Sequence, residues 1–245
     1  MKHLTTARLP RVCMIVLLGC SGTPSGAPSP QPAASARTPA TTSQNANANT
    51  PGSAGGSASV ATAEPVTAKV GDAAPAFELP DLDGKTVRLA DFSGKVVVLE
   101  WFNPECPFVN YAHDKGPLND MAKRFGEKGV VWLAINSAAA GKQGHGIDVN
   151  KKGAAKFGVD HPILLDESGK IGRTYGAEKT PHMFVIDPKG VLVYKGGLDN
   201  APHGEPDGGT LEPLLANAVD AVLAGRPVGK AEARAYGCTV KYGAA

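Results

Sequence analysis

Cys106 is the residue whose type and position point most directly to chemistry. It stands between an apolar run and a proline in the segment VVVLEWFNPECPFVNY. A thiol at the start of a helix lies near unpaired backbone N–H groups, which lower the pKa of cysteine below its ordinary value of ~8.5. Pro107 suits the first helical turn because its missing N–H costs nothing there. Glu105 acts the other way, since a nearby carboxylate disfavours a thiolate. The pattern predicts a reactive thiol; the alternative is a buried cysteine that only fills space.

Cys238 is the candidate partner of this thiol. It lies in AYGCTVKY, beyond the last expected helix. Three roles remain open for it. Cys238 could resolve an oxidised or mixed-disulfide form of Cys106, it could form a permanent disulfide that fixes the tail, or the two thiols could be unrelated.

The N-terminal residues 1–20 have the pattern of a targeting segment. Basic residues precede the apolar run VCMIVLLG, which is too short to span a membrane as an ordinary helix. It ends in LLGC, which resembles the bacterial lipobox, and this resemblance makes Cys20 a lipid anchor. The expected location is the bacterial cell envelope, on the periplasmic or outer-membrane side. A plain secretory signal with an incidental cysteine is the alternative.

Residues 21–65 consist almost entirely of Ser, Ala, Pro, Thr, Gly and Asn. Such a composition cannot bury enough apolar surface to offset the entropy of ordering, so we expect a flexible linker. The remaining residues, 66–245, form one domain. The chain has a net charge of +2, and this balance gives no reason to expect a nucleic-acid partner.

The domain alternates between strand and helix patterns. Two short strands with an Asp83-Gly84 turn are expected in 77–92, and a doubly covered apolar strand in 95–102. The helical pattern that follows, 107–125, is interrupted at Gly116-Pro117. The remaining expected elements are strands at 129–136, 161–166, 182–187 and 191–199 and helices at 148–157, 168–177 and 208–225. This order predicts a three-layer α/β sandwich around a mixed sheet.

Several of these motifs, in this order, resemble the thioredoxin fold. They are the strand leading to Cys106-Pro107, and Thr180-Pro181 before a strand, followed by a hairpin and a last helix. The opening VGDAAPAFELPDLDGKTVRLADFSGK and the segments NPECPFV, AINS, YGAEKTP, LVYKGGLDN and GCTVKY are most similar to the peroxiredoxin-like, single-cysteine branch of the redoxins. The resemblance covers about 70–242. It implies a thioredoxin-like sandwich with an N-terminal β extension and a C-terminal tail.

The resemblance implies a thiol–disulfide redox protein with Cys106 as nucleophile and Cys238 as the resolving thiol. Its partner would be another thiol or disulfide protein, with no bound cofactor. Val109 replaces the second cysteine of thioredoxins, and Asn103 stands where peroxiredoxins carry a hydroxyl residue. A thiol peroxidase acting on peroxides is therefore an alternative that lacks one expected group. A non-catalytic binding module or a metallochaperone is a second alternative.

The same resemblance places Thr180 and Pro181 beside Cys106, with the bond between them cis. Such a bond would leave the backbone of Thr180 free to pair with an extended peptide. The further residues that we expect around the substrate are Trp101, Asn103, Pro107, Phe108 and His182. No metal site is predicted, because Asn110 occupies the position of the second cysteine in copper-delivering relatives of the fold.

Overall fold

The structure, a computed structural model, describes residues 67–244. The predicted signal segment 1–20 with Cys20, and the linker 21–65, lie outside the described residues. Among residues 67–244 no helix has the length and apolar character needed to cross a membrane.

A mixed five-stranded sheet forms the centre of the domain, in the order β5-β4-β3-β7-β8. Strand β3 is parallel to β4 and antiparallel to β7, so it is the central strand. Its burial on both faces explains its nearly continuous apolar sequence. The strands are β3 (Val97–Trp101), β4 (Val131–Asn136), β5 (Ile163–Leu165), β7 (His182–Ile186) and β8 (Leu192–Gly196).

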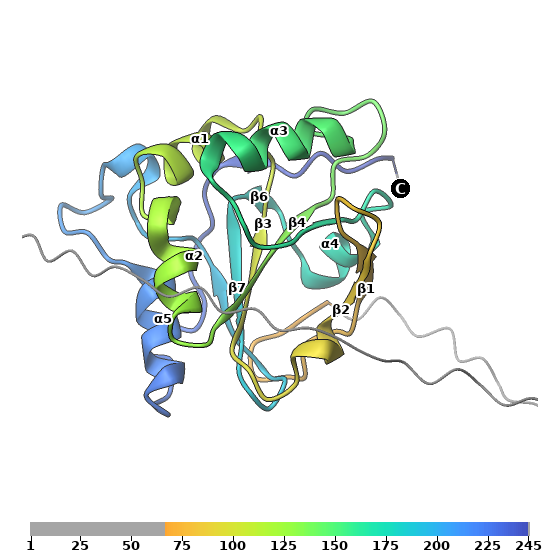
Figure 1. The fold of residues 1–245 in the computed structure, drawn as a ribbon. Coiled ribbons are helices and arrows are strands. Elements are labelled where there is room, and N and C mark those ends of the chain that lie inside the picture. The colour runs from red at the N-terminus through yellow and green to blue at the C-terminus, as the bar shows by residue number, and fades with distance from the viewer. Residues whose placement is uncertain (1–66, 245) are drawn as a thin grey trace, which may run out of the picture. The chain divides into compact units, whose positions relative to one another are not determined.

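Helices and a small hairpin cover the two faces of this sheet (Figure 1). One face carries α1 (Pro107–Asp114), α2 (Leu118–Gly126), α3 (Ile147–Phe157) and α5 (Leu214–Leu223). The other face carries α4 (Lys170–Tyr175) and the antiparallel strands β1 (Glu78–Pro80) and β2 (Thr86–Arg88). The predicted three-layer sandwich with an N-terminal β extension is confirmed.

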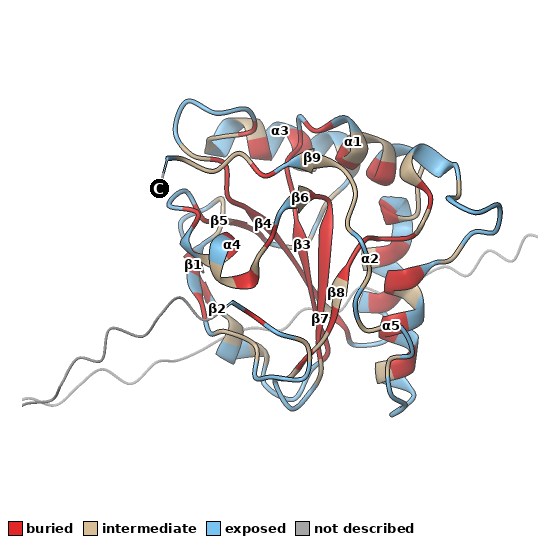
Figure 2. Ribbon diagram, turned by 180° about the vertical axis from the view of Figure 1, so that it is seen from behind, coloured by how far each residue is buried: buried red, intermediate tan, exposed pale blue. Residues whose placement is uncertain are grey.

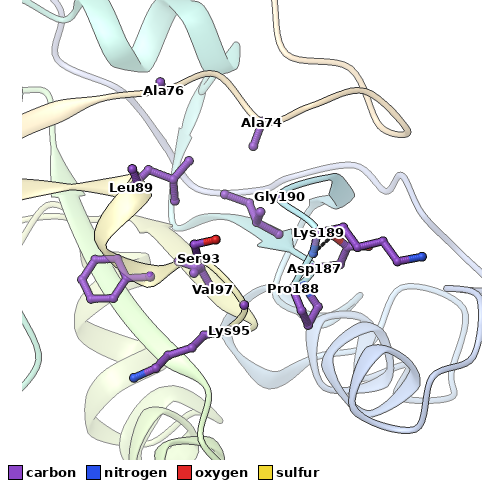
Figure 3. A pocket seen from close by; sticks show the side chains of 14 residues that line it. Ala74, Ala76, Leu89, Ser93, Lys95, Val97, Asp187, Pro188, Lys189 and Gly190 are labelled. Carbon is purple, nitrogen blue, oxygen red and sulfur yellow. Dashed lines mark hydrogen bonds between the residues drawn. The ribbon is translucent and has the colours of Figure 1, made fainter.

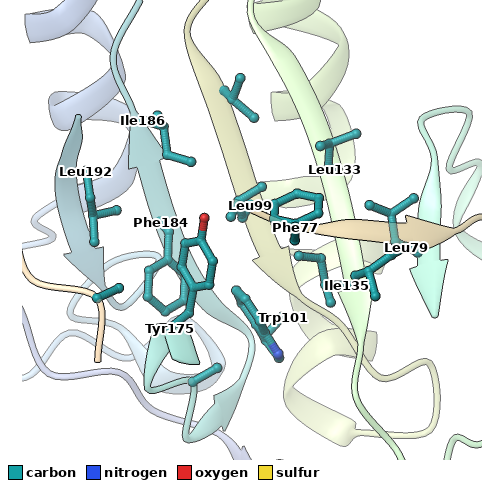
Figure 4. Packing of buried hydrophobic residues seen from close by; sticks show 14 of the residues in the cluster. Phe77, Leu79, Leu99, Trp101, Leu133, Ile135, Tyr175, Phe184, Ile186 and Leu192 are labelled. Atoms are coloured by element: carbon teal, nitrogen blue, oxygen red, sulfur yellow. The ribbon is translucent and has the colours of Figure 1, made fainter. Parts of the chain in front are cut away.

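The core on the hairpin side is rich in aromatic rings (Figure 4). Trp101 packs against Phe184 and Tyr175 with ring centroids 5.0 and 5.5 Å apart. Phe77, next to β1, meets Tyr175 edge to face. The hairpin therefore closes one layer of the core, and buried positions follow all five strands (Figure 2).

Most of the predicted elements are present, with one difference at a helix and two additional short strands. The helical pattern 107–125 splits into α1 and α2 at Gly116-Pro117, as expected. The predicted helix 208–225 begins later than expected, at Leu214, so its predicted start is wrong. Gly208 and Gly209 have φ values of +90° and +86°, and Pro213 directly precedes the first helical residue. Two short strands, β6 (Lys179–Thr180) and β9 (Cys238–Thr239), had no counterpart in the prediction.

The apolar strand β3 contains one fully buried carboxylate that its sequence pattern did not mark as special. Glu100 Oε1 lies 2.7 Å from Nε2 of His113, and Trp132 Nε1–H donates to Glu100 Oε2 at 3.0 Å. Burial by itself raises the pKa of Glu100, but the charge and hydrogen bond of His113 hold it below its ordinary value. This pair ties α1 to the sheet.

Candidate active site

Cys106 is the residue immediately before α1, and Pro107 is the first residue of that helix. Its backbone is extended, at φ −79° and ψ 126°, so the sulfur lies over the first turn, as the sequence predicts. The residue is fully buried, at 0 % exposure. Val109, which stands where thioredoxins have a second cysteine, is buried in the same apolar cluster.

Thr180 and Pro181 lie directly beside this thiol, and the bond between them is cis, as expected. The Cys106 thiol donates a hydrogen bond of 3.1 Å to the carbonyl oxygen of Thr180. The Thr180 hydroxyl is also buried, and its oxygen has no hydrogen-bond partner among the described residues. That hydroxyl is therefore available to donate to the Cys106 sulfur when the sulfur is ionised.

The C-terminal tail brings Cys238 to the same place. Strand β9 pairs antiparallel with β6, and in this register Cys238 is opposite Thr180. The expectation that the backbone edge of Thr180 is free for a peptide is wrong in this structure, because the tail occupies that edge. Figure 2 shows β9 lying between β6 and α1. Both cysteines are free thiols, Cys106 buried and Cys238 half-buried.

The groups around the two sulfurs favour a negative charge on Cys106. Burial raises the pKa of this thiol, but hydrogen bonds from the Cys238 thiol and from Thr180 lower it, helped by the backbone N–H groups of Val109 and Cys238. The Thr180 carbonyl opposes them, because it accepts only from the neutral thiol. The donors prevail, and the pKa of Cys106 lies below its ordinary value. Burial and the neighbouring Cys106 raise the pKa of Cys238 to about 11.

A loop from another part of the chain holds the turn before Cys106. The Asn103 side chain donates to the Gln143 carbonyl at 3.1 Å and accepts from the Glu105 N–H at 2.9 Å. The Glu105 carboxylate accepts from the Gly144 N–H at 2.7 Å. Asn103 therefore shapes the turn, with its side chain 3 % exposed, and Glu105 is bound to the loop.

The other predicted site residues divide into two groups. Pro107 is exposed and Phe108 is half-buried, so both border the surface beside the thiols. Phe108 packs against His203 with ring centroids 4.1 Å apart and the rings tilted by 32°. Trp101 has 0 % exposure and donates from Nε1 to Ser137 Oγ at 3.0 Å. The structure thus places the Trp101 side chain in the core, where no substrate reaches it directly.

His182 is buried beside β6 rather than facing solvent. Its Nδ1 accepts from the Glu178 N–H at 3.3 Å, and its ring packs against the tilted ring of Phe184 with centroids 4.6 Å apart. Burial, together with the positive charge of Lys195, lowers the pKa of His182 to about 3. A neutral, buried imidazole supports the strand next to the cis bond and is not an exposed base.

Two features of the site were missed in the sequence. Gly237 has φ +125°, and a Cβ on it would lie 2.2 Å from the Thr180 carbonyl oxygen. Only glycine lets the tail approach this closely, and the Gly-Cys pair in AYGCTVKY was the available signal. The second feature is Gly144, whose amide binds Glu105; it lies in the Gly-rich loop after β4.

Two other kinds of site would be a cavity away from Cys106 and a metal-binding cluster. The cavity in Figure 3, about 260 Å³, lies at the start of β3, whereas Cys106 follows the end of that strand. Its wall includes Val97 and the turn from Asp187 to Gly190. Within the described part of the chain, no cluster of three or more His, Cys, Asp or Glu residues could hold a metal ion.

The fold and this pair of thiols, one of them at a helix start beside a cis-proline, define a thioredoxin-like redox protein. The chain belongs to the Redoxin family, whose model matches residues 69–210. The thiol-disulfide oxidoreductase ResA of Geobacillus thermodenitrificans is 31% identical, over 52% of this chain and 68% of the relative. ResA of Bacillus thuringiensis subsp. konkukian is 29% identical, over 51% and 68%.

Two solved structures match a larger share of the chain. A hypothetical protein of Sinorhizobium meliloti 1021 matches with a TM-score of 0.65 and 31% identity, covering 73% of this chain and 97% of the other. An uncharacterized conserved protein of Geobacillus kaustophilus matches with the same TM-score and identity, covering 72% and 94%.

Proposed function

We propose that this protein is a thiol–disulfide oxidoreductase that works through a reversible disulfide between Cys106 and Cys238. The observation that carries the proposal is that Cys238 lies opposite Thr180, whose carbonyl oxygen accepts the hydrogen bond of the Cys106 thiol at the start of α1. The similarity to relatives named thiol-disulfide oxidoreductase supports it. The redox partner is a thiol or disulfide protein, and the exchange itself consumes no bound cofactor.

The two thiols have different parts in this proposal. Cys106 holds the thiolate, which is the form of cysteine that attacks disulfides. Cys238 supplies the second sulfur, so that an oxidised equivalent ends as an intramolecular disulfide and the partner leaves. Thr180 and Pro181 shape the pocket for the Cys106 sulfur. Phe108 and Pro107 form the adjoining surface, which a partner would contact.

The test is exchange turnover by the full chain. Oxidised protein is mixed with a reduced peptide that contains two cysteines, with oxidised glutathione present to restore the protein disulfide, and formation of the peptide disulfide is followed by mass spectrometry. We expect Cys106→Ser and Cys238→Ser each to reduce turnover at least about a hundredfold, with unfolding midpoints measured as a control for folding. Wild-type turnover by Cys106→Ser would exclude the enzyme and leave a binding module or metallochaperone.

The location forms a separate part of the proposal. We place the protein in the bacterial cell envelope, anchored through a lipid on Cys20, and the support is the LLGC sequence with the low-complexity stretch 21–65 after it. A chain with Cys20→Ala should leave the membrane fraction of expressing bacteria. Retention of that variant in the membrane fraction would overturn the lipid anchor without affecting the redox proposal.

A further inference from the structure

The two sulfurs differ sharply in their access to solvent. Cys106 has 0 % exposure, whereas Cys238 is only half-buried. The tail that carries Cys238 lies against the cis-proline edge, with Cys238 opposite Thr180. Because Thr180 also accepts the hydrogen bond of the Cys106 thiol, and Cys238 packs against the apolar cluster that holds Cys106, the tail covers the backbone edge beside the buried thiol.

The tail is fixed to the domain on both sides of Cys238. Before it, the backbone of Lys195 in β8 makes two hydrogen bonds to the tail. The Lys195 N–H donates to the Ala231 carbonyl at 3.0 Å, and the Lys195 carbonyl accepts from the Ala233 N–H at 3.1 Å. After it, the Val240 N–H donates to the Glu178 carbonyl at 3.0 Å. Tyr242 continues this attachment with a hydroxyl hydrogen bond of 2.7 Å to the Ala177 carbonyl. Cys238 therefore cannot move away from Cys106 unless one of these flanks separates.

The geometry of thiol–disulfide exchange determines which of the two sulfurs an external thiolate can attack. The attacking thiolate approaches one sulfur along the S–S axis, opposite to the sulfur that leaves. In a Cys106–Cys238 disulfide, attack on Cys106 would have to reach a residue with 0 % exposure that is packed in the same apolar cluster as Phe102 and Val109. Attack on Cys238 has to reach only a half-buried residue of the tail.

The relative stability of the two thiolates also favours Cys106 as the leaving group. A sulfur whose thiolate is stabilised leaves more readily. The groups that stabilise negative charge, which are the Thr180 hydroxyl and the backbone N–H groups of Val109 and Cys238, surround Cys106. Cys238 lacks a comparable set, and its pKa is raised.

We propose that, in the oxidised protein, an external thiol attacks Cys238 and expels Cys106 as the leaving thiolate. This inference rests on the proposed function and names the substrate class, which is a polypeptide with two reduced cysteines. Its first thiolate forms a bond to the Cys238 sulfur as the Cys106–Cys238 bond breaks. Its second thiolate then attacks the sulfur of its own first cysteine, which releases Cys238 as a thiol after protonation. The substrate loses two electrons and two protons, and the protein disulfide gains them; an external disulfide, such as oxidised glutathione, restores it.

The first experiment locates the mixed disulfide. The full chain is oxidised with oxidised glutathione, mixed with excess reduced glutathione, and quenched in acid over a series of short times. Peptide mapping in acid separates Cys106 and Cys238 from Cys13 and Cys20. We expect the glutathione adduct on Cys238 in at least about tenfold excess. An adduct mainly on Cys106 overturns the inference.

The second experiment measures the identity of the leaving group and needs no trapped adduct. Thr180→Val removes the hydroxyl that stabilises the Cys106 thiolate but keeps the shape of the side chain. If Cys106 leaves, reduction of the disulfide by glutathione should be about threefold or more slower than in wild type. An unchanged rate overturns the inference. Failure of oxidised glutathione to produce any Cys106–Cys238 disulfide would instead overturn the proposed function itself.

Discussion

Cys238 lies opposite Thr180 in the antiparallel pair of β9 and β6, and Thr180 also accepts the thiol hydrogen bond of Cys106 at 3.1 Å. A single residue thus connects the two cysteines, which are separated by more than half of the domain in sequence. The C-terminal tail occupies the backbone edge at which the sequence suggested an incoming peptide would bind. The accessibility of the site therefore depends on how tightly the tail is held.

Gly237 provides the most direct test of that dependence. Gly237→Ala places a Cβ 2.2 Å from the Thr180 carbonyl oxygen at a backbone φ of +125°, so the tail must shift. We expect a loss of roughly 1–3 kcal/mol in the free energy of unfolding. We also expect at least about tenfold faster alkylation of Cys106 by iodoacetamide in the reduced protein, because reaction requires exposure of the thiolate.

Gly229→Ala is the matched control for this experiment. Gly229 lies in the same tail, but a Cβ there meets nothing within 4 Å. Alkylation of Cys106 should remain at the wild-type rate in this variant. If both variants react equally fast, the close approach of Gly237 to Thr180 is not what protects Cys106.

The ionisation of Cys106 should be visible in a thiolate titration. The pKa of Cys106 lies below its ordinary value, so absorbance at 240 nm should rise at a pH below that of a free cysteine. Cys106→Ser should remove this step. Cys238→Ala should shift it to higher pH, because the Cys238 thiol is the strongest of the donors that stabilise the Cys106 thiolate. A step unaffected by Cys106→Ser would belong to another group.

His182 makes the stability of the protein depend on pH in the acid range. Its pKa is about 3 in the folded protein and 6.5 when unperturbed, so at pH 5 the unfolded chain binds a proton that the folded chain does not. The free energy of unfolding from this group should therefore fall by about 2 kcal/mol between pH 7 and pH 5. Urea unfolding at the two pH values measures this loss.

His182→Gln isolates that contribution from those of other groups. Glu100 and His161 also have shifted pKa values, and they contribute to the acid dependence of both proteins. The difference between wild type and His182→Gln should shrink by about 2 kcal/mol on going from pH 7 to pH 5. A constant difference would mean that the pKa of His182 is not lowered in the folded protein.

Peroxide distinguishes exchange from the peroxidase alternative. Asn103 occupies the position of the expected hydroxyl, its amide is bound to Gln143 and Glu105, and Cys106 is fully buried. We expect the intact mass of the reduced protein to change only slowly with one equivalent of hydrogen peroxide. A rapid loss of about 2 Da would show that Cys106 forms a sulfenic acid and that Cys238 condenses with it.

The sequence alone was sufficient for the order along the chain of the five central strands and the helices around them, because β3 is apolar on both faces and the helices have clear breakers. Gly116-Pro117 separated α1 from α2 as predicted. The position of Cys106 before Pro107 likewise predicted the cysteine at the start of α1, since proline favours the first helical turn. The start of α5 was predicted too early, because the favourable helix pattern extended across a glycine pair whose backbone is not helical.

Only the tertiary structure decided what surrounds Cys106. Local patterns in the sequence carry no information on where a tail without strong helix or strand preference lies, so β6 and β9 were not foreseen. Their pairing needs the close approach at Gly237, and this approach places Cys238 over the buried thiol. The sequence identified both cysteines. The long-range contact between the tail and β6 leaves Cys106 buried and Cys238 half-buried beside it. The sequence could not show this, because burial and hydrogen bonding at each sulfur depend on segments far apart in the chain.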